Sequence, residues 1–176
     1  KALAAYLFQL SATNSPGVDE AEIHLATIIQ PGVSAQRRRA MLDVMEAFVR
    51  DKTANVRSDE QRRQAGNMRM YRSYRKWVLH TWELSGPAET WGAQLEALYK
   101  KQPVFALVGG LGNVGWQPIH DFSERFGIPS VFPQVDLPGL KGSGHYTFYL
   151  SRGVVLEADV LARFLRDKGM PARLMQ

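Results

Sequence analysis

Cysteine is absent from this chain of 176 residues. Its absence excludes disulfide bonds, thiolate zinc sites, a cysteine nucleophile and covalent haem attachment through a C-x-x-C-H motif. It leaves the compartment open, because a periplasmic protein can lack cysteine. The chain also lacks an apolar run long enough to cross a bilayer, so we expect no membrane insertion. It begins at Lys1 without an initiator methionine or a signal-peptide pattern, which is typical of a processed or excised chain.

Histidine is scarce, with four residues that lack the spacing of metal ligands: His24, His80, His120 and His145. The first two fall in expected strands, where a core or sheet role is typical. His120 and Asp121 are adjacent on an expected helix, so their side chains point in different directions and cannot form a catalytic pair. No serine has a positioned base. We therefore expect no enzymatic activity, no cofactor and no metal site.

Positive charge is confined to one segment. Residues 35–76 hold twelve Lys or Arg against five Asp or Glu, a balance of +7, whereas the whole chain carries +5, so the rest has a net charge of −2. Nucleic-acid binding would require this basic segment to belong to a recognised module, and none is visible. We expect no nucleic-acid partner.

Hydrophobic patterning predicts strands that alternate with helices. Apolar, β-branched runs indicate strands at 23–29, 77–82, 104–108, 128–132 and 146–150. Helical spacing of apolar residues follows each of them except the run at 128–132, which leads into a glycine-rich loop at 137–145. This order is that of βαβ units with right-handed crossovers. The predicted fold class is α/β, a three-layer αβα Rossmann-like lobe with a mostly parallel sheet.

We divide the chain into an N-terminal helical arm and linker at 1–17 and the α/β lobe at 18–176, with a basic insertion at about 54–76 that is either a helical excursion or a surface loop. Two helices are expected to bury an apolar side. The first side comprises Met41, Val44, Met45, Phe48 and Val49, and the second comprises Ala158, Leu161, Ala162 and Leu165.

The strand at 104–108 runs into a glycine-rich turn at 109–115. A helix then begins near Pro118, and we expect Gly127 to cap its C-terminal end. A strand, a tight turn and a helix N-terminus place backbone N–H groups at the carboxyl edge of the sheet, where open α/β folds bind ligands. The turn also fits the G-x-G-x-x-G dinucleotide pattern from Gly110 to Gly115, which keeps an NAD(P)-dependent oxidoreductase as an alternative. The acid that this fingerprint requires would have to be Asp136, which lies too far along, beyond Pro133.

Several segments together resemble type I periplasmic binding proteins of the branched-chain amino-acid receptor class. They are the helix at 90–99, the strand and turn at 103–110, Gln117-Pro118 at a helix start, 126–133 and 146–153. The resemblance implies the amino-terminal lobe of a two-lobed periplasmic receptor, part of an ABC-transporter-like or sensory system with a membrane permease as partner. The second lobe would follow Gln176.

The chain departs from this family where amino-acid receptors hold the ligand's carboxylate with serine and threonine. Asn113, Val114, Gly115 and Trp116 stand there instead, so we do not expect an ordinary amino-acid ligand. Trp116 would either stack on the ligand or lie in the core. The residues we predict to bind a small molecule are Asn113, Gly115, Trp116, Gln134, Val135, Asp136, Tyr149 and Ser151.

A third possibility is a docking module for an acidic periplasmic protein. The segment at 57–76 interleaves arginines with Tyr71 and Tyr74 and leads to Trp77, and arginine and aromatic residues are favoured interface anchors. A solvated loop is the alternative. Residues 1–10 resemble the closing helix of a c-type cytochrome, which would fit such a partner; otherwise they form a terminal arm. Whether two copies pair is left open.

Overall fold

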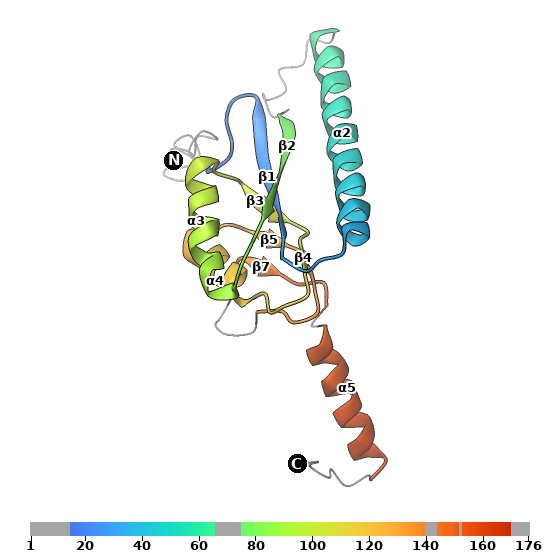
Figure 1. Ribbon diagram of the computed structural model, residues 1–176. Helices are drawn as coiled ribbons and strands as arrows, with labels where there is room; N and C mark the ends of the chain where they lie inside the picture. Colours follow the sequence, from blue (N-terminus) through green and yellow to red (C-terminus); the bar gives the residue numbers. More distant parts are fainter. Residues whose placement is uncertain (1–14, 66–74, 140–143, 152, 170–176) are drawn as a thin grey trace, which may run out of the picture.

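The structure is a computed structural model that describes residues 15–65, 75–139, 144–151 and 153–169. It confirms the predicted fold class, because parallel strands form one sheet with helices on both faces (Figure 1). The seven strands are β1 (Glu22–Ile29), β2 (Lys76–Glu83), β3 (Ala106–Val108), β4 (Leu111–Gly112), β5 (Ser130–Val131), β6 (Gln134–Val135) and β7 (Thr147–Phe148).

Two positions in the sheet are each occupied by a pair of short strands that follow one another in the chain: β3 with β4, and β5 with β6. β1 pairs with β2 on one side; on the other it pairs first with β3 (Leu25 with Ala106) and then with β4 (Ile29 with Leu111). Between these two pairs the segment from Ala106 to Leu111, which includes Gly109 and Gly110, has one residue more than the segment of β1 from Leu25 to Ile29. β5 pairs with β3 and β6 pairs with β4, without an extra residue between the two pairings. Across the sheet the order is therefore β2, β1, β3 with β4, β5 with β6, and β7.

The hydrophobic core lies on one face of the sheet, beneath α3 (Trp91–Lys101), which the short 3₁₀ helix η2 (Ala88–Thr90) precedes, and α4 (Gln117–Phe126). α4 begins with Pro118 in its first turn and ends at Gly127, whose φ of 64° provides the predicted C-terminal cap. Strand and helix side chains meet here, and each of these residues is at most 4% exposed: Ala26, Ile28, Trp82, Leu84, Trp91, Leu95, Val104, Leu107, Trp116, Ile119, Phe122 and Ile128.

The opposite face carries α2 (Ala35–Ala65) and is only partly covered. The prediction that its apolar stripe is buried was wrong, because Val44 and Phe48 are 69% and 52% exposed and the other three stripe residues are half-buried. Phe48 meets Trp77 of β2 edge-on, with ring centroids 5.9 Å apart. One helix is too narrow to cover this face, so an apolar gap of about 210 Å³ remains between α2 and the sheet.

α5 (Val154–Asp167) stands away from the sheet (Figure 1). The prediction of a buried side was wrong here too. Ala158, Leu161 and Ala162 are exposed, Leu165 is half-buried, and α5 has no buried residue. The helix is amphipathic by sequence, but its direction is set by its first residues, where the N–H of Val154 donates to the carbonyl of Asp136.

The basic insertion is in part a continuation of α2, which extends to Ala65. Trp77 is half-buried in β2. Tyr71, Tyr74 and residues 1–14 of the expected arm and linker lie outside the described residues. Among the helices that the structure describes, none combines the length and apolarity needed to span a bilayer.

The chain enters β1 through a tight turn at the amino edge of the sheet. Oδ1 of Asp19 accepts the N–H groups of Ala21 and Glu22 at 2.7 and 2.6 Å, and these two bonds hold the pKa of the carboxyl below its ordinary value. His24 contacts His80 of β2, and burial followed by the charge of His24 lowers the pKa of His80.

Candidate functional site at the carboxyl end of the sheet

The carboxyl ends of β1 and β4 form a topological switch point. The loop after β1 leads to α2 on one face of the sheet, and the loop after β4 leads to α4 on the other face. Neighbouring strands whose connections leave in opposite directions open a crevice between their loops, and ligands of open α/β sheets bind in such crevices. In this chain the two loops are 30–34 and 113–116, and the crevice is the place where these loops meet; the open space beside them is the groove between α2 and the strand ends.

Gln30 fastens the two loops together. Its side chain is 2% exposed; Oε1 accepts the N–H of Val114 at 3.1 Å, and Nε2 donates to the carbonyl of Gly115 at 3.3 Å. Gly112 leaves the room for this amide, since a Cβ there would lie 2.5 Å from Gln30 Oε1. The floor of the crevice is therefore a buried amide that satisfies the backbone of the β4–α4 loop.

The arginines at the start of α2 form the rim of the crevice. Arg37 Nη1 donates to Asn113 Oδ1 at 3.2 Å, and Asn113 Nδ2 donates to the carbonyl of Gly32 at 2.9 Å. Arg38 pairs with Glu83 at the end of β2. A helix N-terminus disfavours cations, so these two side chains reach away from the helix toward acceptors on neighbouring elements.

An apolar groove of about 490 Å³ opens beside the crevice, between α2 and the ends of the strands. Arg37 and Gln134 supply its polar groups. Phe132 lies on its wall, 53% exposed and with a φ of 55°, and among the described residues no other non-glycine has a positive φ. A bulky side chain in this backbone region is strained, and such strain is concentrated at functional sites. The wall also includes Met41, Val44, Met45, Val108, Leu111 and Val131.

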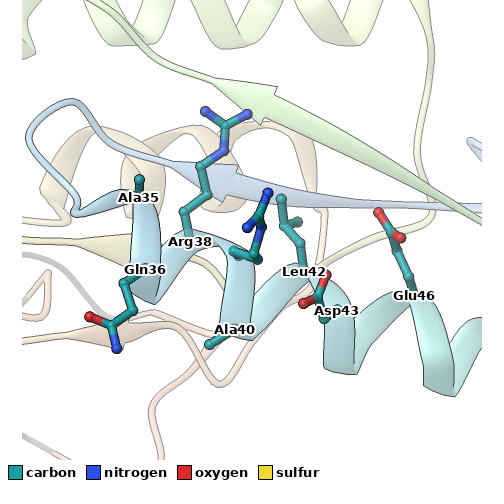
Figure 2. A pocket seen from close by; sticks show the side chains of 8 residues that line it. Ala35, Gln36, Arg38, Ala40, Leu42, Asp43 and Glu46 are labelled. Carbon is teal, nitrogen blue, oxygen red and sulfur yellow. The ribbon is translucent and has the colours of Figure 1, made fainter.

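A larger hollow of about 760 Å³ lies along another side of α2 (Figure 2). All eight side chains that line it come from this one helix. Figure 2 shows that Arg38 extends toward β2, where it meets Glu83. No described residue of a second element lines the hollow, so nothing converges there on a bound molecule, and we assign no site to it.

The predicted binding residues divide into three groups. Asn113 and Gly115 lie at the crevice and Gln134 at the groove. Trp116, Val135 and Tyr149 pack in or against the core; Trp116 has no exposed surface, so of its two predicted positions it takes the one in the core. The third group lies at the base of α5, where the Asp136 carbonyl accepts the Val154 N–H and Ser151 Oγ accepts the Gly153 N–H.

Sequence reasoning missed three residues of the site: Gln30, Arg37 and Phe132. Gln30 directly follows a strongly apolar strand and precedes Pro31, a position at the carboxyl edge that could have identified it. Arg37 is the first of three consecutive arginines in the sequence. Only the proximity of Asn113 distinguishes it from Arg39, and the sequence does not contain that proximity.

The geometry opposes the dinucleotide alternative. That fingerprint needs a bare glycine against which a pyrophosphate can lie. The side chain of Gln30 occupies this place above Gly112, and a Cβ at Gly110 would lie 2.8 Å from the indole of Trp116. The glycines of this turn make room for the protein's own side chains. Residues 110–112 of the turn are thus buried, with the side chains of Trp116 and Gln30 against them, whereas Asn113 and Val114 are exposed to solvent.

A polar cluster lies behind the core residues of the site. Glu124 accepts the N–H groups of His145 and Tyr146 at 3.0 and 2.8 Å. Burial raises its pKa, but these two bonds, together with the charges of His120 and His145, hold the pKa below the ordinary value of 4.5. Burial raises the pKa of Tyr149, whose hydroxyl accepts the Gly139 N–H. Both ring nitrogens of His120 are buried and have no hydrogen-bond partner among the described residues, and its ring stacks on Tyr149.

Comparisons with family models and with curated proteins give no match to this sequence. The resemblance to periplasmic receptors therefore stays a prediction.

Proposed function

We propose that this chain is a solute-binding lobe that holds a small organic anion at the carboxyl end of its sheet, without chemistry. The single observation that carries the proposal is the switch point, where the crevice meets the groove of about 490 Å³ lined by Arg37 and Gln134. A guanidinium binds a carboxylate through paired N–H donors. The methionine and valine wall suits an apolar body behind that carboxylate.

The setting of the proposed lobe follows from the resemblance to type I periplasmic binding proteins. Such a lobe would act in the periplasm as part of a receptor for a membrane permease or a sensory partner. One lobe supplies only part of the contacts of a closed cleft, so its own affinity for a carboxylate should be weak. Sequence departures at 113–116 speak against an ordinary amino acid as the ligand.

The test is a titration of the full chain with aliphatic and aromatic monocarboxylates, each matched with its uncharged amide. Amide resonances of Val114 and Gly115 report binding at the crevice in ¹H–¹⁵N NMR spectra. We expect saturable shifts with carboxylates, and Arg37→Ala should weaken binding about tenfold, which corresponds to about 1.4 kcal/mol.

The matched control is Arg39→Ala, which removes the same charge from the same helix but lies outside the groove. If Arg39→Ala weakened binding as much as Arg37→Ala, the effect would come from net charge in general, and the site would be refuted. Saturable binding of NAD with shifts at the same amides would instead favour the oxidoreductase alternative.

A further inference from the structure

A second cluster of polar side chains lies at the opposite, amino edge of the sheet, where β1 begins. The turn before β1 doubles back, with a bridge between Val18 and Ile23 and a hydrogen bond from the His24 N–H to the Gly17 carbonyl at 2.7 Å. Gly17 is pressed against Val104, and a Cβ there would lie 2.4 Å from the backbone. The turn is therefore packed tightly against the backbone of Val104 and Phe105, just before β3.

This turn brings one imidazole and two carboxylates together. His24 Nε2 lies 3.7 Å from Asp19 Oδ2 and 3.8 Å from Glu22 Oε2, and the three ligand atoms all lie within 4.8 Å of one another. Two donors bonded to Zn²⁺ at about 2.1 Å with tetrahedral geometry are separated by about 3.4 Å. The two distances from His24 Nε2 are thus within a few tenths of an ångström of that separation. The two carboxylate oxygens lie no more than 4.8 Å apart.

Two of the three donors are oriented before any ion arrives. Asp19 uses Oδ1 for the Ala21 and Glu22 N–H groups, which leaves Oδ2 directed at His24. The other nitrogen of His24, Nδ1, lies 2.9 Å from His80 Nε2. When Nδ1 carries the proton and donates it to His80, Nε2 has its lone pair toward the carboxylates. Metal-bound histidines are commonly oriented by such a second hydrogen bond.

We propose that Asp19, Glu22 and His24 form a binding site for a divalent first-row transition ion such as Zn²⁺, with His80 as the positioning residue for His24. His24 is 16% exposed at the side chain, whereas Glu22 and Asp19 are 38% and 58% exposed, so water can reach the ion and complete its coordination. Arg75 donates to the Asp19 carbonyl and places a positive charge nearby. That charge opposes the binding of a cation and should weaken its affinity.

The test is isothermal titration of the full chain with ZnCl₂, and with CoCl₂ followed by visible absorption. The native chain should bind one ion. Each of His24→Gln, Asp19→Asn and Glu22→Gln should weaken binding at least tenfold, and His80→Phe, which removes the acceptor but keeps a ring, should weaken it about tenfold. His145→Gln is the matched control, because this exposed histidine lies outside the cluster, and it should bind as the native chain does.

Circular dichroism identifies any variant that fails to fold, and the two carboxylate variants replace exposed side chains, so at least they should remain folded. Absence of saturable binding by the native chain, or native affinity in His24→Gln or Asp19→Asn, would overturn the site. The approach of His24 to the two carboxylates would then be a feature of the turn alone. Neither outcome affects the proposed anion site, whose residues lie at the other edge of the sheet.

Discussion

Replacement of Gln30 is the most direct test of how the crevice is built. Gln30→Ala removes two hydrogen bonds between the end of β1 and the loop after β4, and it also removes a side chain that is 2% exposed. Each bond is worth about 1 kcal/mol net, and the lost packing adds about 1 kcal/mol. We expect the free energy of unfolding to fall by about 3 kcal/mol.

Urea denaturation followed by tryptophan fluorescence measures this change, since Trp82, Trp91 and Trp116 all lie in the core. Gln30→Met separates the two contributions: it keeps most of the volume, and the free energy of unfolding should fall by about 2 kcal/mol. Hydrogen exchange at Val114 should accelerate in both variants. Gln134→Ala, at the exposed end of β6, is the control and should change stability by less than about 0.5 kcal/mol. A loss under about 0.5 kcal/mol in Gln30→Ala would refute the role given to this residue.

Two further predictions concern the glycine turn and the polar cluster. Gly110→Ala should lower the free energy of unfolding by about 2 kcal/mol or more, because its φ is 113° and the new Cβ would meet Trp116 at 2.8 Å. Gly115→Ala, which meets nothing within 4 Å, should cost less than about 1 kcal/mol in the same denaturation experiment, and equal losses would contradict the packing described. Ionised Glu124 has a folded pKa below its ordinary value, so its contribution is present above about pH 4.5 and is lost as the pH falls through the folded pKa. Thermal melts should therefore show Glu124→Gln less stable than the native chain at pH 7, by about 1 kcal/mol, with the difference shrinking toward pH 3; a constant difference would rule this out.

Most of the architecture could be predicted because it depends on local pattern. The β-branched run at 23–29, the proline in the first turn of α4 and the glycine that ends it each act within a few residues, and the structure has them where they were expected. Burial was predicted less well. An apolar stripe says which side of a helix prefers a partner, but whether a partner is there depends on the rest of the fold. Phe48 and Leu161 remain exposed for that reason.

The residues of the two candidate sites could not be predicted from the hydrophobic pattern of the sequence. The sequence by itself determined a parallel α/β sheet with a glycine turn at its carboxyl edge, since side-chain periodicity and turn chemistry are properties of neighbouring residues. Tertiary structure alone decided that Gln30 covers Gly112, that Arg37 meets Asn113, and that His24 and His80, 56 residues apart in the chain, share a hydrogen bond. Strand pairing brings such residues together, and the register of that pairing is set by the whole sheet.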